Sequence, residues 1–95
     1  MRMGAVIRIP GPLRRITDNQ DKVTVEDGSL AATIETLESR FPGIQDRLLD
    51  ENGNLRHFVN IYVNGEDVQF LDNLETVIKD GDEVSIVPAV AGGQR

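Results

Sequence analysis

The stretch DGSLAATIETLESRFPG, residues 27–43, contains the most clearly defined element of this sequence. Its apolar residues recur at spacings of four, three and four, which places them on one stripe of a helix. These residues are Leu30, Ile34, Leu37 and Phe41. Ser29 stands in the N-cap position, where its hydroxyl can accept a hydrogen bond from an amide of the first turn. Pro42-Gly43 then ends the helix, so the fold is built around one helix with a single buried face.

Two strands are predicted before this helix. The segment Met3 to Pro10 alternates weakly, and Pro10-Gly11-Pro12 stops it because proline lacks the amide donor of a sheet ladder. A polar turn cluster, Thr17 to Asp21, precedes a second alternating segment, Lys22 to Glu26. Two strands joined by a turn predict a hairpin.

After the helix, residues Ile44 to Leu49 predict one or two helical turns. Arg56 to Val63 returns to period two and predicts a strand. Asn64-Gly65 is typical of a type I′ turn, because both of its central residues need positive φ. A brief strand, Glu66 to Val68, should follow this turn.

The last third of the chain leads into a final strand. Phe70 to Lys79 has apolar residues spaced for anchoring rather than for a long helix. Asp80-Gly81-Asp82 predicts a tight turn into the strand Glu83 to Pro88. We therefore expect one domain over residues 1–88 and a flexible C-terminal tail over residues 89–95.

This order of elements predicts an α+β domain in which one main helix packs across a mixed sheet. The first and last strands should lie side by side in its middle. If Val59, Ile61 and Val63 face the helix, alternation places the intervening side chains on the open face of the sheet. The expected open-face residues are Phe58, Tyr62, Ser85 and Val87. Phe58, Tyr62 and Val87 then form an exposed apolar patch near the root of the tail, which is typical of a partner-binding surface.

The composition excludes several classes of function. Ten basic residues against sixteen acidic ones give a net charge of −6, and only Arg14-Arg15 are adjacent, so neither nucleic acid nor an anionic membrane is an expected partner. The chain has no cysteine and a single histidine, His57, so thiolate chemistry and histidine-rich metal sites are excluded. No glycine-rich phosphate loop, signal peptide or membrane span occurs. We expect a cytoplasmic monomer that is not an enzyme and binds neither a metal nor a cofactor.

The end of the chain allows two interpretations. Ala89-Val90-Ala91-Gly92-Gly93 is either a frayed terminus or a thin backbone that presents a carboxylate to another protein's active site. A carboxylate is a poor electrophile. It becomes reactive when a nucleotide α-phosphate is attached to it, because AMP is then the leaving group. The composition alone favours neither interpretation.

Three segments resemble the ThiS/MoaD family of ubiquitin-like sulfur carriers, and its CysO type most. They are Arg56 to Val68, Asp80-Gly81-Asp82-Glu83-Val84, and Val87 to Gly93. The resemblance covers nearly the whole chain in the same element order and implies the β-grasp fold.

By this resemblance, Gly93, preceded by Gly92, is the residue that an E1-like enzyme adenylates with its own ATP and that becomes a thiocarboxylate. The sulfur then passes to an enzyme of cysteine, thiamin or molybdopterin synthesis or of tRNA thiolation. Partner binding is expected at Phe58, Tyr62, Val87, Pro88 and Val90.

The sequence departs from the family at its end, because Gln94-Arg95 follows Gly93. Gly93 then has no free carboxylate, and the chain is a precursor that a peptidase must cut between Gly93 and Gln94. The two residues are either a native extension or an artificial addition.

Three functions stay open from the sequence: a sulfur carrier, a modifier joined through Gly93 to lysines of target proteins, and a β-grasp interaction domain with an inert tail. The receiving pathway and the peptidase are not identified by the sequence either.

Overall fold

The structure is a computed structural model that describes residues 4–88. Seven strands, two α-helices and three short 3-10 helices follow one another along this part of the chain. In chain order they are β1 (Ala5–Arg8), η1 (Gly11–Leu13), β2 (Lys22–Val25), β3 (Gly28–Ser29), α1 (Leu30–Arg40), α2 (Ile44–Leu48), β4 (Val59–Val63), β5 (Glu66–Asp67), η2 (Val68–Phe70), η3 (Asn73–Glu75), β6 (Val77–Ile78) and β7 (Glu83–Pro88).

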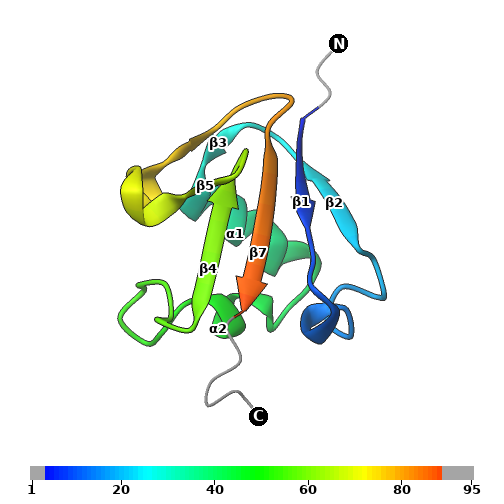
Figure 1. Cartoon of the computed structure of the whole chain (residues 1–95). Coiled ribbons are helices and arrows are strands. Elements are labelled where there is room, and N and C mark those ends of the chain that lie inside the picture. The colour runs from blue at the N-terminus through cyan, green and yellow to red at the C-terminus, as the bar shows by residue number, and fades with distance from the viewer. Residues whose placement is uncertain (1–3, 89–95) are drawn as a thin grey trace.

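Five strands form the main sheet in the order β2-β1-β7-β4-β5 (Figure 1). β1 and β7 pair in parallel, with Ile7 opposite Val84, whereas every other neighbouring pair in this sheet is antiparallel. The prediction that the first and last strands lie together in the middle of a mixed sheet is confirmed.

Helix α1 begins and is buried as the sequence predicts. The Ser29 hydroxyl accepts a hydrogen bond from the amide of Ala32 at 3.1 Å, and Leu30, Ile34 and Leu37 are almost fully buried. Phe41 is the C-cap and only partly buried, so the helical stripe ends one residue earlier than its spacing suggests. The Glu38 carboxylate accepts from the amides of Gly43 and Gln45, and so links the end of α1 to the start of α2.

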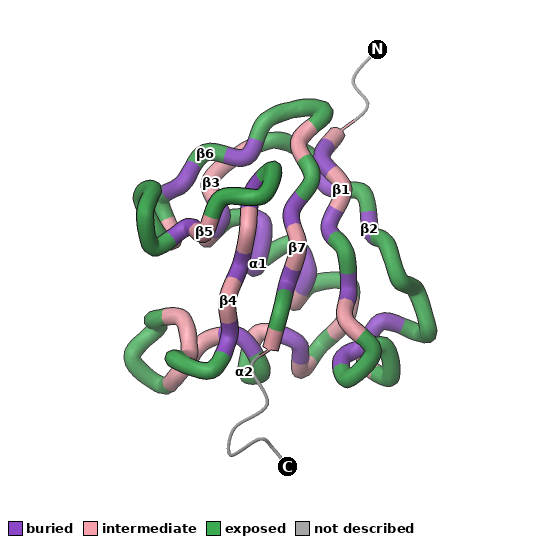
Figure 2. Tube along the Cα trace, in the orientation of Figure 1, coloured by how far each residue is buried: buried purple, intermediate pink, exposed green. Residues whose placement is uncertain are grey.

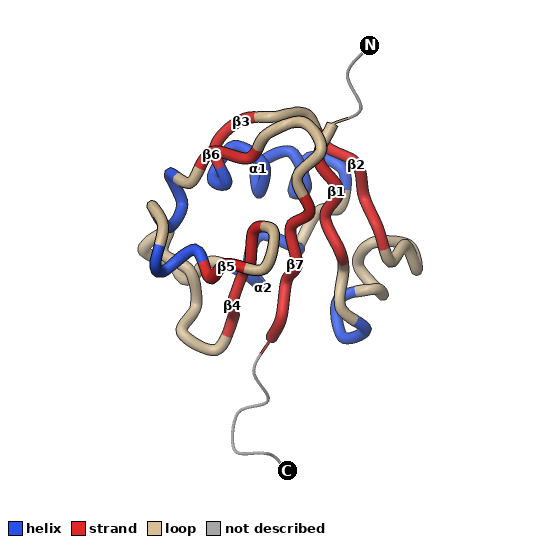
Figure 3. The backbone as a smooth tube through the Cα atoms, turned by 45° about the horizontal axis from the view of Figure 1, so that its top comes forward, coloured by secondary structure: helices blue, strands red, loops and turns tan. Residues whose placement is uncertain are grey.

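The core lies between α1 and one face of the sheet. Figures 1 and 3 show both α-helices behind the strands, and Figure 2 shows buried and less buried residues alternating along β4 and β7. Val59, Ile61 and Val63 are buried with Val84 and Ile86, which confirms the predicted inward face of these two strands. The opposite face of the sheet carries no helix of the described chain.

Several predicted boundaries are wrong. The strand predicted from Arg56 begins only at Val59, because the Val59 amide donates to the Arg56 carbonyl at 2.9 Å and closes a turn there. Val68 lies in η2 rather than in a strand, since the Asp67 carboxylate accepts from the Gln69 amide and starts a helical turn.

A second, two-stranded sheet pairs β3 with β6 and was not predicted. Each of its strands has two residues, which is too short for a periodic pattern. Within residues 4–88, no helix is long and apolar enough to cross a membrane.

Candidate functional site

The C-terminal end of β7 is held firmly in the sheet. Pro88 lies opposite Val59, and Val87 lies opposite Asn60, so β4 pairs with β7 up to its last residue. On its other side, β7 pairs with β1 only over Glu83–Ser85, so β4 alone holds its last residues. The tail predicted over residues 89–95 therefore starts from a fixed point. Its predicted site residues lie outside the described part of the chain; they are Val90, Gly92, Gly93 and Gln94.

Two of the predicted partner-binding residues lie on the open face of the sheet. Val87 is 43% exposed, and Tyr62 is half-buried between its neighbours Ser85 on β7 and Asp67 on β5. The predicted alternation is therefore correct for both residues, and their role in binding stays a prediction. On the same face, Arg8 forms an ion pair with Glu83, and this carboxylate raises the pKa of the guanidinium.

Phe58 does not belong to this face. The alternation that placed it there is wrong, because Phe58 lies in the turn before β4 and not in the strand. Its ring stands edge-on to the His57 ring, with 5.6 Å between centroids, and the Arg56 guanidinium carbon lies 6.0 Å from its centroid. These contacts hold an aromatic ring that is 37% exposed.

Phe58 and Pro88 together line a hollow of about 500 Å³ that we call the tail-root groove. Its lining residues are Pro10, Pro12, Leu13, Arg47, Phe58, Val59, Ile86 and Pro88. The lining is apolar except for the side chain of Arg47. The predicted patch therefore divides into two neighbouring surfaces, the open face of the sheet and this groove.

The residues that η1 and α2 contribute to the groove were not predicted. The pattern of Pro10-Gly11-Pro12 predicts only the end of a strand, and Arg47 belongs to a segment that predicts only a short helix. A signal was present, since Leu13 is a large apolar residue next to Arg14 and Arg15, and it is 7% exposed in the structure. Arg14 braces this connection by donating from Nε to the Ile9 carbonyl at 3.1 Å.

The acidic turn at the other end of β7 has a structural role. Asp82 accepts a hydrogen bond from Asn64 Nδ2 at 3.0 Å and one from the Lys79 amide at 2.8 Å. These bonds lower the pKa of its carboxyl, the bond from Asn64 most. Asn64 also accepts from the Glu83 amide, so the turn after β4 is joined to the start of β7. Residues 4–88 contain no cluster of three acidic or histidine side chains that could hold a metal ion.

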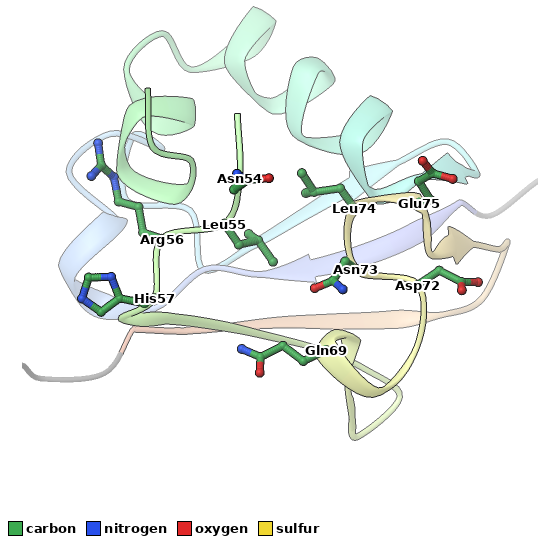
Figure 4. Close-up of a pocket in the computed structure, with 9 residues that line it drawn as sticks. All are labelled: Asn54, Leu55, Arg56, His57, Gln69, Asp72, Asn73, Leu74 and Glu75. Atoms are coloured by element: carbon green, nitrogen blue, oxygen red, sulfur yellow. The ribbon is translucent and has the colours of Figure 1, made fainter. Parts of the chain in front are cut away.

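A second hollow, of about 740 Å³, lies between the loop before β4 and the segment η2–η3 (Figure 4). Leu55 and Leu74 face the space between the two segments, His57 lies at one end, and Asp72 and Glu75 lie at the other. Its polar groups are spread along the hollow, whereas a ligand site needs a few convergent ones. No pattern in the sequence predicts this hollow, and its geometry points to no chemistry.

The family model described as "ThiS family" matches residues 7–93, which is most of the chain. The chain belongs to the ThiS family.

This ThiS-family chain is similar to a sulfur carrier protein and to a small archaeal modifier protein. The sulfur carrier protein CysO of Mycobacterium tuberculosis is 48% identical over 93 residues, covering 96% of this chain and 100% of the relative. The small archaeal modifier protein 3 of Haloferax volcanii is 38% identical over 68 residues, covering 72% and 73%.

Solved structures of two CysO proteins share the fold. The Amycolatopsis orientalis BexX/CysO complex matches with a TM-score of 0.88 and 42% identity, covering 95% of this chain and 100% of the other. Mycobacterium tuberculosis CysO matches with a TM-score of 0.86 and 46% identity, covering 92% and 100%. The expected family, β-grasp fold and non-enzymatic class are confirmed.

Proposed function

We propose that this protein is a sulfur carrier whose C-terminal glycine, Gly93, becomes a thiocarboxylate after Gln94-Arg95 is removed. The observation that supports this proposal most is the extent of the family match, which ends at Gly93, two residues before the end of the sequence. The similarity to CysO over almost the full length of both proteins supports a carrier role.

The proposed chemistry takes place on the carboxylate in the active site of an E1-like enzyme. A carboxylate oxygen attacks the α-phosphate of ATP, the bond between the α- and β-phosphates breaks, and pyrophosphate leaves. A sulfur nucleophile such as hydrosulfide then attacks the acyl carbon and displaces AMP, giving the thiocarboxylate and one proton. The second step exchanges a good leaving group for a sulfur atom and needs no redox partner.

The geometry of β7 supports the presentation of the tail. Pro88 is fixed by its pairing with β4, and five residues follow it up to Gly93. Fully extended, five residues span at most about 18 Å. An enzyme that docks on the open face can therefore receive the carboxylate in an active site within that distance of Pro88.

The proposal includes three kinds of partner: an E1-like adenylating enzyme, a biosynthetic enzyme that accepts the sulfur, and a peptidase that cuts after Gly93. The solved complex of a CysO protein with BexX supports docking of such a carrier on another protein. The carrier itself binds no cofactor, since ATP is bound by the enzyme. The proposed location is the cytoplasm, where ATP for the E1-like enzyme is available.

The test compares the full chain with a form trimmed after Gly93, each incubated with an E1-like enzyme, ATP and sulfide. The trimmed form should support ATP–pyrophosphate exchange and gain the mass difference between sulfur and oxygen. The full chain should do neither, because its Gly93 carboxyl group is an amide. Exchange by the full chain at the rate of the trimmed form would refute the assignment of Gly93.

The control is the trimmed form with Gly92→Val. This substitution adds a branched side chain next to the reacting carboxylate. We expect it to lose exchange and to keep the melting temperature of the trimmed protein. A fall of several degrees would mean that Gly92 packs against the domain, which contradicts a presented tail.

A second candidate function is protein modification, supported by the similarity to small archaeal modifier protein 3. The same adenylate then reacts with a lysine amine of a target protein instead of with sulfur. In a cell extract, tagged trimmed protein would form a ladder of heavier species that resists thiol reductants. A thiocarboxylate without such a ladder favours the carrier.

A further inference from the structure

The tail-root groove combines two properties that the proposed docking on the open face does not explain. Its volume of about 500 Å³ can hold a large side chain, and it lies where β7 ends rather than on the open face of the sheet. Two of its lining residues are held by contacts within the domain. Leu13 is held in η1 by the hydrogen bond from its amide to the Pro10 carbonyl at 3.0 Å, and Phe58 is held by its contacts with Arg56 and His57.

Arg47 gives this apolar groove a positive charge. It lies in the last turn of α2, is exposed, and forms no ion pair with any residue of 4–88. Its neighbour Asp46 lies on a different side of the helix, since adjacent helical residues do not face each other. In a chain of net charge −6, an unpaired guanidinium beside an apolar hollow favours an acidic partner group.

We infer that the tail-root groove binds a segment of a partner protein in which a large apolar side chain stands next to a carboxylate. The apolar side chain fills the space between Leu13, Phe58 and Pro12, and the carboxylate pairs with Arg47. This inference rests on the proposed function, because the partner is the one that receives the tail. Pro88 lines the groove and directly follows Val87, which lies on the open face, so one partner can contact both surfaces around the end of β7.

An apolar anchor in a preformed pocket is the usual centre of binding energy in an interface, and a charge at its rim adds selectivity. The groove therefore gives a partner a means to distinguish this carrier from one with the same Gly-Gly ending and a different residue in place of Arg47.

The probe for the test is the blocked peptide Ser-Glu-Leu-Phe-Glu-Ser, titrated into the ¹⁵N-labelled full chain and followed by amide chemical shifts. We expect saturable shifts at Leu13, Phe58 and Val59. Two matched peptides serve as controls: one has serines in place of leucine and phenylalanine, and the other has lysines in place of the glutamates. Each should bind at least about tenfold more weakly.

The variant Arg47→Glu should reverse the preference, so that the lysine peptide binds more tightly than the glutamate peptide. Arg15→Glu makes the same change in charge at an exposed residue that does not line the groove, and should leave the preference unchanged. Equal effects of the two variants, or shifts confined to Tyr62 and Val87 on the open face, would overturn the inference. Shifts at groove amides on dilution of the protein alone would also overturn it, because they would identify a second copy as the occupant.

This test is independent of the exchange assay on the trimmed form. ATP–pyrophosphate exchange without peptide binding would refute the binding role of the tail-root groove and leave the proposed function standing. Peptide binding without exchange would refute the proposed function, and the groove would then be a docking site in a different role.

Discussion

Individual residues of β4 have opposite environments although they are neighbours in the chain. Val59 and Ile61 are 3% and 1% exposed in the core, whereas Tyr62 is half-buried on the open face. The same substitution should therefore have different consequences at adjacent positions, because a charge is tolerated on a surface and is very costly in a core.

The variant Tyr62→Glu should weaken binding to the E1-like partner by at least about 1 kcal/mol, because it brings a charge into a desolvated contact. Its unfolding transition should stay close to that of the wild type. Val59→Glu should unfold the domain instead. Calorimetry for the binding free energy and circular dichroism for unfolding measure the two effects, and a folded Val59→Glu variant would contradict the buried position of this side chain.

Asp82 provides a prediction about acid stability. Because its hydrogen bonds from Asn64 and Lys79 lower the pKa of the carboxyl in the folded state, they stabilise the fold above the ordinary aspartate pKa of 3.8. This contribution is lost as the pH falls through the lowered pKa of the folded protein. Asp82→Asn keeps one acceptor and should cost about 1 kcal/mol or less at pH 7, since solvent screens this partly exposed group.

Urea unfolding at neutral pH and at stepwise lower pH, down to about pH 2, measures this effect. The difference in unfolding free energy between wild type and Asp82→Asn should shrink below pH 3.8. Asp18→Asn removes the same charge from an exposed loop and controls for net charge. A difference that stays constant with pH would show that the two hydrogen bonds do not depend on ionisation of Asp82.

At the scale of the elements, the stability of α1 depends on the hydrogen bond that caps its first turn. Ser29→Ala removes the hydroxyl that accepts from the Ala32 amide and should lower the free energy of unfolding by about 1 kcal/mol. Thr36→Ala removes an exposed hydroxyl that donates to the Ala32 carbonyl inside the helix, and should change it by less than about 0.5 kcal/mol. Denaturant titration compares the two, and equal losses would contradict a capping role for Ser29.

The elements with a strong local period were predictable, and the short ones were not. The stripe of Leu30, Ile34 and Leu37 and the alternation of Val59, Ile61 and Val63 each repeat often enough to define a buried face. β3 and β6 have two residues each, and their pairing depends on the path of the chain between Gly28 and Ile78. No local pattern contains that information.

The candidate site also contains residues that the sequence predicts correctly and residues that it does not. Tyr62 and Val87 followed from alternation, because both lie within regular strands. Phe58 does not follow the alternation, since the turn that ends at Val59 makes the strand begin three residues later than the sequence predicts. The groove was missed because η1, α2 and β4 contribute to it, and only the folded chain brings Leu13, Arg47 and Phe58 together.

At the scale of the whole molecule, the parallel pairing of β1 and β7 joins the two ends of the sequence in the centre of the sheet. Val6 lies opposite Glu83, and the Val6 amide donates to the Asp82 carbonyl at 2.9 Å. Contacts so distant in sequence slow folding, because a long loop must close before they form. They also mean that a fragment without β7 lacks the middle of its sheet.

Because β1 and β7 run in the same direction, the chain enters the sheet at one end and leaves it at the other (Figure 1). Val6 lies opposite Glu83, and Pro88 is the sixth residue of β7, so the start of β1 and the end of β7 are roughly 17 Å apart along the sheet. A resin, dye or fusion partner attached ahead of Gly4 is therefore held away from the groove and the tail. Immobilised in this way, the protein would expose the tail-root groove and the end of β7 to solvent. A circular permutant would need a linker long enough to run along the sheet from one end to the other.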